Sequence, residues 1–178
     1  MLTSIRPASS LNAEAVLPLA LVLTQLGYES ESERSDLVDG FRRAALGWIE
    51  QRTRRSLSIR TWVATYSGIA GAVFLPWQPV QEVTAVSYRS AAGAAVPVLL
   101  GWDADGESLI LARHAGIPAG RPVAVTFTAG YANVEDEAPQ LRMAALLLAQ
   151  HLHNGGTTKD VPATVESLCE DFRAPVIA

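Results

Sequence analysis

The sequence of 178 residues contains one cysteine, Cys169, and one lysine, Lys159. A single cysteine excludes a disulfide framework within the chain and any zinc site built from several cysteines. We therefore interpret Cys169 as a small side chain packed on a helix. Because lysine is so scarce, arginine supplies nearly all the positive charge. Arginine favours planar, bidentate contacts with carboxylates, which are common at protein interfaces.

The sequence also lacks a long apolar run. The best candidate, AVLPLALVL at 15–23, contains Pro18 and has no basic flank before it. It is also shorter than the roughly eighteen residues that a membrane-spanning helix needs. We expect neither a signal peptide nor a membrane anchor, and a location in the cytoplasm or in an assembly inside the cell.

An excess of positive charge is missing too. The formal net charge is -4, and 49% of the residues are hydrophobic. An acidic balance argues against general nucleic-acid binding, and the apolar content argues against a wholly disordered chain.

One stretch has the outline of a catalytic loop. VAVTFTAGYANVEDEAPQLRM starts at 123 as an alternating strand, turns at Gly130 and enters a helix near Pro139. Phosphate sites and nucleophile elbows share this outline. Here, however, Glu135, Asp136 and Glu137 follow the turn and would repel a phosphate. We interpret the stretch as a structural joint, and predict a positive φ at Gly130 and Pro139 in the first helical turn.

No other set of side chains has the spacing of a catalytic or metal site. His151 and His153 are two residues apart and do not share a helix face. His114 lies in a predicted loop, and no serine has a G-x-S-x-G context. Asp103 and Asp105, in WDADGES, indicate a β-turn rather than a calcium loop. We expect a protein that is not an enzyme and that holds no cofactor or metal.

Hydrophobic periodicity predicts helices at both ends of the chain and strands between them. Expected helices cover about 18–26 and 139–153, about 162–172, and a segment that starts at an S-x-x-E capping box, Ser30 with Glu33. The predicted fold class is α+β: a mainly helical domain of about four helices with an inserted small antiparallel β-region. The expected parts of this single domain are an extended arm at 1–13, helices at 14–56, the β-insertion at 57–131, helices at 137–173 and a tail at 174–178.

Charge is segregated along the second helical segment, with acids near its start and arginines near its end. One interpretation is a solvated helix that complements its dipole. A second is an interface between subunits, and a third is a nucleic-acid patch over Arg42 to Arg60. The contacts expected between subunits involve Glu31, Glu33, Asp36, Asp39, Arg42, Arg43, Arg52, Arg54 and Arg55.

Four stretches, in order, resemble the head–tail connector (adaptor) proteins of long-tailed bacteriophages. They are ERSDLVDGFRRAALGWIEQRTRRSL at 33–57, FLPWQPVQEVTAVSYRSAAG at 74–93, VAVTFTAGY at 123–131 and VPATVESLCEDFR at 161–173. The first is similar to the family's A-x-x-x-V/I-E-x-x-T-x-R-x-L helix. The residues that carry this similarity are Ala45, Ile49, Glu50, Thr53, Arg55 and Leu57.

The resemblance implies a helical connector domain with a β-insertion, and a homo-oligomeric ring of about twelve copies below the portal protein. Such a ring extends the DNA channel, lets DNA pass without specific binding, and docks the next neck protein, a stopper or a tail terminator. The implied location is the neck of a virion or phage-like particle, from a phage, a prophage or a gene transfer agent, assembled in the bacterial cytoplasm without a membrane.

The resemblance also implies that the C-terminal segment engages the portal. The residues expected to do so are Val165, Leu168, Phe172, Arg173, Pro175, Val176 and Ile177. Two alternatives remain at this stage. The chain is another neck or tail-completion protein of the same particle, or a small enzyme with an unrecognised site around His114, Asp103 and Asp105.

Overall fold

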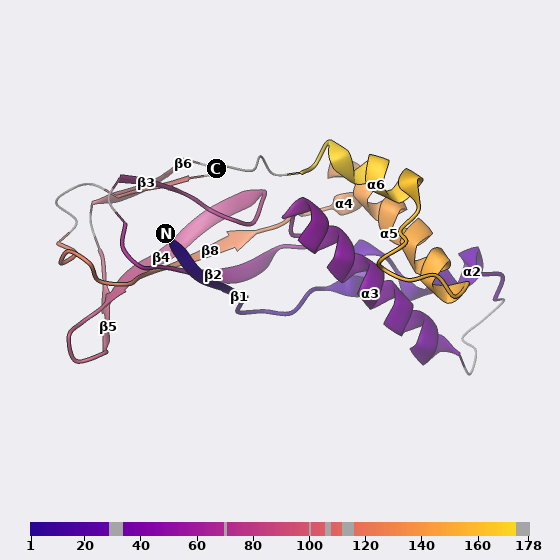
Figure 1. Cartoon of the computed structure of the whole chain (residues 1–178), viewed down its shortest axis with the longest axis horizontal. Coiled ribbons are helices and arrows are strands. Elements are labelled where there is room, and N and C mark those ends of the chain that lie inside the picture. The colour runs from indigo at the N-terminus through magenta and orange to yellow at the C-terminus, as the bar shows by residue number, and fades with distance from the viewer. Residues whose placement is uncertain (29–33, 70, 100, 106–107, 112–115, 174–178) are drawn as a thin grey trace. The chain divides into compact units, whose positions relative to one another are not determined.

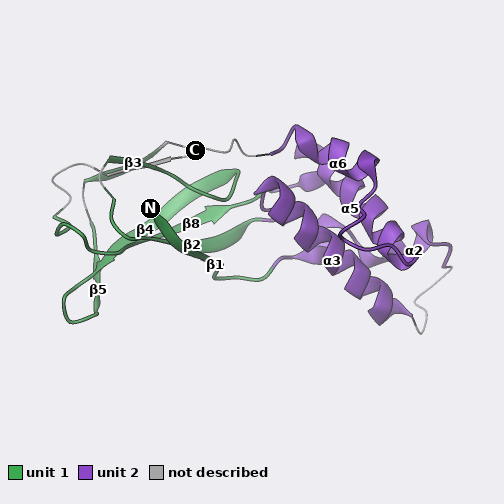
Figure 2. Ribbon diagram, in the orientation of Figure 1, with its two compact units in different colours: residues 1–10, 59–130 green, residues 11–58, 131–178 purple. Residues whose placement is uncertain are grey.

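The computed structural model describes residues 1–28, 34–69, 71–99, 101–105, 108–111 and 116–173. It divides the chain into two compact units, coloured separately in Figure 2. The sheet unit contains residues 1–10 and 59–130, and the helical unit contains residues 11–58 and 131–178. Each unit therefore joins segments that are far apart in the sequence.

The sheet unit is built on a five-stranded antiparallel sheet in the order β1-β2-β8-β4-β5 (Figure 1). A smaller antiparallel sheet has the order β3-β7-β6. In the first sheet, the strands are β1 (Leu2–Pro7), β2 (Arg60–Tyr66), β8 (Val123–Ala129), β4 (Val80–Arg89) and β5 (Ala95–Pro97). In the second, they are β3 (Gly71–Phe74), β7 (Ser108–Leu111) and β6 (Trp102–Asp105).

Alternation in sequence separates the large sheet into an apolar face and a polar face. In VAVTFTA, the apolar residues Val123, Val125 and Phe127 are fully buried, while the residues between them are only partly buried. Trp62 pairs with Phe127 on the neighbouring strand, and its ring stacks on Trp77 with centroids 4.2 Å apart. Because side chains alternate across a strand, every second residue is left for the opposite face.

The helical unit contains six helices within the described residues, two of them only one turn long. They are α1 (Ala13–Val16), α2 (Leu19–Gln25), α3 (Ser35–Thr53), α4 (Val134–Glu137), α5 (Pro139–His153) and α6 (Ala163–Glu170). None of the helices in the described part combines the length and the apolarity that crossing a membrane requires.

Helix α5 lies at the centre of this unit, in contact with α2, α3, α4 and α6. Leu141, Ala145 and Leu148 are fully buried along it, and Leu46 and Ile49 of α3 belong to the same core. Truncating a core leucine such as Leu148 to alanine costs about 2–5 kcal/mol. The broad apolar surface that the sequence gives α5 is thus used mostly inside the chain.

The predicted fold class was wrong in its proportions. The structure is an α+β fold with a five-stranded antiparallel sheet and six helices in its described part, not a mainly helical domain of about four helices with a small β-insertion. Residues 2–7, expected in an extended arm, form strand β1 on β2. The two additional helices, α1 and α4, have four residues each, too few to show helical periodicity. The β-region is large because its strands enclose a hydrophobic core of their own.

The joint between the units follows the sequence-based prediction. Gly130 has φ 134°, a backbone conformation that suits glycine, and Pro139 occupies the first turn of α5. The acids between them form α4, where the Asn133 side chain accepts a hydrogen bond from the Glu135 N–H at 3.1 Å. The predicted capping box of Ser30 and Glu33 lies outside the described residues.

Candidate functional site

The charged residues at the start of α3 are held within one chain. Arg42 is only 4% exposed, and it donates to a Glu14 carboxylate oxygen at 2.6 Å, to the Leu17 carbonyl at 2.8 Å and to Asp39 at 2.7 Å. Asp39 also accepts from Arg43 at 2.6 Å. Arg42 thus fastens the α1–α2 junction to α3, and it is a structural residue of this unit.

These contacts change the acidity of both carboxyl groups. The hydrogen bond from Arg42 lowers the pKa of Glu14 below its ordinary value. Burial raises the pKa of Asp39, but the hydrogen bonds from Arg43 and Arg42 outweigh it, so that the pKa is lowered overall. Both carboxylates therefore stay charged across the neutral range.

The arginines at the end of α3 contact the C-terminal part of the chain. Arg52 donates to Glu166 of α6 at 3.0 Å and lies over the Trp48 ring, 5.9 Å from its centroid. Arg55 donates to the Phe172 carbonyl at 3.2 Å. Arg54 ends the helix in the left-handed conformation, φ 57°, with its N–H on the Glu50 carbonyl.

The residues predicted to contact neighbouring subunits therefore have different surroundings in the structure. Arg42 is buried, Arg43 and Asp36 are exposed, and Glu31 and Glu33 lie outside the described residues. Among the others, Asp39, Arg52 and Arg55 have the contacts within the chain given above. A role between subunits stays a prediction for this set.

The predicted portal-binding residues have different surroundings. Val165 is fully buried in the helical core, Leu168 and Phe172 are partly buried against it, and Arg173 is exposed. Pro175, Val176 and Ile177 lie outside the described residues. Their role at a portal stays a prediction as well.

Cys169, His151 and His153 all lie in the helical unit. Burial raises the pKa of the Cys169 thiol to about 11, which keeps it protonated and unreactive. His153 shares a hydrogen bond with the Tyr28 hydroxyl at 3.0 Å, and His151 is 3.7 Å from an Asp160 oxygen. No group of three or more metal-ligating side chains occurs in the described ranges.

Of the residues named for the enzyme alternative, the structure describes Asp103 and Asp105. His114 lies outside the described residues. Asp103, expected in a β-turn, lies in strand β6, where its carboxylate accepts from the Ala104 N–H at 2.8 Å. Asp105 pairs with Ser108 in the same small sheet.

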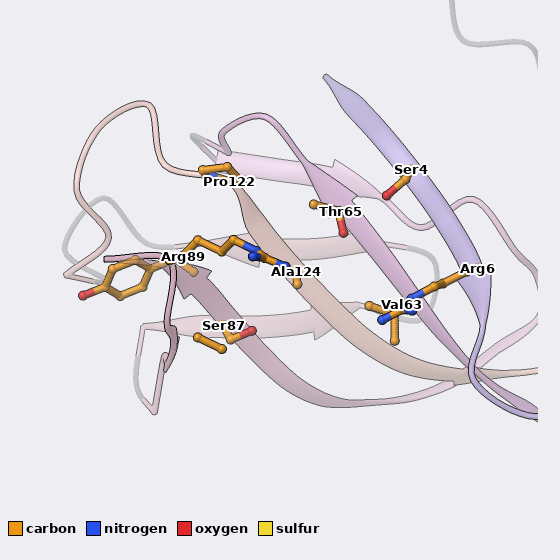
Figure 3. Close-up of a pocket in the computed structure, with 11 residues that line it drawn as sticks. Ser4, Arg6, Val63, Thr65, Ser87, Arg89, Pro122 and Ala124 are labelled. Atoms are coloured by element: carbon orange, nitrogen blue, oxygen red, sulfur yellow. The ribbon is translucent and has the colours of Figure 1, made fainter. Parts of the chain in front are cut away.

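A hollow of about 470 Å³ lies on the polar face of the five-stranded sheet. Its floor includes one row of paired residues, Ser4, Thr65, Ala124 and Ser87, from four adjacent strands. Figure 3 shows Arg6, from β1, extending toward Val63, and Arg89, from β4, lying across the sheet toward Ala124. Arg6 and Arg89 are exposed and form no ion pair with any described residue. We call this hollow the arginine groove.

Sequence analysis did not find the arginine groove. Arg6 was assigned to an arm, and Arg89 is isolated in the sequence, so that no cluster marked either residue. Only the pairing of β1 with β2 brings them to the same face. The alternation in LTSIRP, with Ser4 and Arg6 on one face and Ile5 on the other, was the available signal.

No protein-family model matches the chain, and no curated protein matches it. The chain does match solved structures. One is the neck of an empty gene transfer agent particle computed with C6 symmetry, and another is the virion of a native gene transfer agent particle; each is 26% identical, with TM-score 0.79. A third is the neck of a native particle computed with C12 symmetry, 27% identical, with TM-score 0.77. Each match covers 99% of this chain and 98% of the other.

These matches support the class of structural virion proteins. Two of the three matched structures are necks of gene transfer agent particles, and the similarity spans both units of this chain. The similarity therefore supports a phage-like neck protein with a structural role in such a particle.

Proposed function

We propose that the chain is a head–tail connector subunit, a single connector domain that forms a ring below the portal of a phage or gene transfer agent particle. The observation that carries the proposal is the match over nearly the full length to the necks of gene transfer agent particles. Both necks were computed with cyclic symmetry, C6 and C12. Cyclic symmetry is what a ring of about twelve copies would give, with head-to-tail contacts between neighbours.

In this proposal the chain acts without catalysis or a cofactor. The ring extends the DNA channel, and its neighbours are the portal above and a stopper or tail terminator below. The net charge of -4 suits a channel through which DNA slides, because the 18 acidic residues outnumber the 14 basic ones that could hold phosphates. Exposed charges of α3 contact neighbouring subunits, and the C-terminal segment that includes Arg173 contacts the portal.

The test is to co-express the full chain with the portal protein of its own particle and to examine the product by electron microscopy and native mass spectrometry. We expect a closed ring attached to the portal. A chain that stays monomeric and never binds the portal would show that the proposal is wrong. Cross-links in purified particles that reach tail proteins but not the portal would instead identify another neck or tail-completion protein.

The proposed portal contact is tested by Arg173→Ala together with removal of residues 174–178. We expect rings that form normally but bind the portal more weakly. Arg121→Ala, in the sheet unit, is the matched control, since it removes one arginine without touching the C-terminal segment. Unchanged portal binding in the first variant would contradict the assignment of this segment.

A further inference from the structure

We propose that the arginine groove binds a carboxylate-bearing segment of a second copy of this chain. The inference rests on the proposed ring, since it identifies one of the surfaces through which neighbouring copies meet. It is built on the sheet unit alone, from the charge, the size and the surroundings of the groove.

The first step is the charge of the groove. Arg6 and Arg89 both line it, and none of its described lining residues is acidic. Neither guanidinium has an ion-pair partner among the described residues. A guanidinium binds carboxylates through paired N–H groups, so the groove favours an anionic occupant.

The second step is the polarity of the floor. Ser4, Thr65 and Ser87 present hydroxyl groups, which both donate and accept hydrogen bonds. Ala124 lies between Thr65 and Ser87 in the same row, and its small side chain leaves the centre of the floor open. Hydroxyls beside a small residue suit the N–H and C=O groups of a main chain laid across the strands.

The third step is size. The two arginines project from β1 and β4, which are three strand spacings or about 14 Å apart. A hollow of about 470 Å³ holds a segment of a few residues with a carboxylate toward each end. A DNA-binding surface, by contrast, is usually part of a basic chain, and this chain has a formal net charge of -4. We therefore favour a protein segment over nucleic acid.

The fourth step identifies the occupant as a second copy. A head-to-tail ring joins two different surfaces of the same chain, one from each neighbour. The helical unit supplies the complementary charge: Asp36, Glu170 and Asp171 are exposed and form no ion pair with any described residue. These acids of one copy can therefore meet the arginines of the groove in the next copy.

The first experiment compares full-length Arg6→Glu/Arg89→Glu with the wild type by native mass spectrometry at physiological salt. We expect the concentration needed for half-maximal ring formation to rise about tenfold or more, because two attractive contacts become repulsive. Arg121→Glu, a charge reversal in the same unit but outside the groove, should form rings as the wild type does. Far-UV circular dichroism confirms that each variant is folded.

The outcomes are distinguishable. Rings that form equally well in the double variant overturn the groove inference and leave the proposed function intact. A wild-type chain that forms no ring, alone or with the portal, overturns both. Equal loss of rings in Arg121→Glu also overturns the inference, because general charge would then explain the effect.

The second experiment places a photo-cross-linking amino acid at Ser87 in assembled rings. We expect a cross-linked peptide from a second copy that contains Asp or Glu, identified by mass spectrometry. Cross-links to DNA, to the portal or to another neck protein would overturn the inference, as would assembled rings without any cross-link.

Discussion

Arg42 in the helical unit and the pair Arg6 and Arg89 in the sheet unit have opposite surroundings. In the helical unit, Arg42 is buried and has two carboxylates and a carbonyl around it. In the sheet unit, Arg6 and Arg89 are exposed and have no ion pair in the described structure. Several arginines of the cluster that is conspicuous in the sequence therefore have partners within the helical unit, Arg42 among them. Arg6 and Arg89, which are isolated in the sequence, are among the cations available to a partner.

The strongest test of this contrast is Arg42→Ala. We expect a loss of about 2–4 kcal/mol in the free energy of unfolding, because the Leu17 carbonyl and two carboxylates lose a buried donor. Urea denaturation of the full chain measures it, with Arg43→Ala as the matched control. Arg43 is 63% exposed, so its removal should cost about 0–1 kcal/mol. Equal losses in the two variants would contradict a special role for Arg42.

The second test uses pH. The pKa values of Glu14 and Asp39 are lowered from 4.5 and 3.8, so these groups contribute stability above those values and lose it as the pH falls through their lower folded pKa values. We expect the unfolding free energy to decline as the pH falls below about 4.5. The decline should be shallower in Arg42→Ala, because Glu14 then loses the hydrogen bond that lowers its pKa most and Asp39 keeps only the one from Arg43. Parallel pH profiles for the two proteins would count against this linkage.

The third test concerns the other end of α3. Arg52→Ala removes the half-exposed ion pair with Glu166 and the contact with Trp48, and we expect it to cost about 0.2–1 kcal/mol. Glu166→Ala should cost a similar amount, and the double variant no more than the two together. A loss as large as that of Arg42→Ala would mean that this pair is also structural.

The smallest change in the free energy of unfolding is expected for substitutions in the arginine groove. Arg6→Ala and Arg89→Ala should each change the unfolding free energy by less than about 0.5 kcal/mol, as surface substitutions away from special features do. The same urea titration measures both. A loss above about 1 kcal/mol would show that these arginines stabilise the sheet unit itself, which would end the contrast with Arg42.

Much of the fold was predictable because its signals are local. The run VAVTFTAG contains the alternation of β8 and the turn at Gly130, and Pro139 marks the start of α5. Strand β1 was missed because an edge strand of six residues needs its partner β2, more than fifty positions away in sequence, to be recognised. The segment WDAD was expected to form a turn, but it extends as β6. Pairing with β7 overrides the preference of aspartate for turns.

The site was predictable only in part, and for a related reason. Sequence shows which charges exist but not which are already paired. The charges from Asp36 to Arg55 left a solvated helix, an interface and a nucleic-acid patch as interpretations. In the structure, the distant residues Glu14, Glu166 and Phe172 supply partners for several of these arginines. Tertiary contact decides what charge remains available at the surface.

The way the chain crosses between units bears on how it folds. Residues 59–130 interrupt the helical unit, whose two flanks meet where the Tyr131 N–H donates to the Ser56 carbonyl at 3.3 Å. Closing a flexible loop of that length costs about 2.5 kcal/mol more than closing a loop of a few residues, at about 0.6 kcal/mol per doubling. In the folded sheet, Arg60 pairs with Ala129, which already brings the two ends together. A sheet unit that is already folded would therefore lower the entropic cost of assembling α3 against α5.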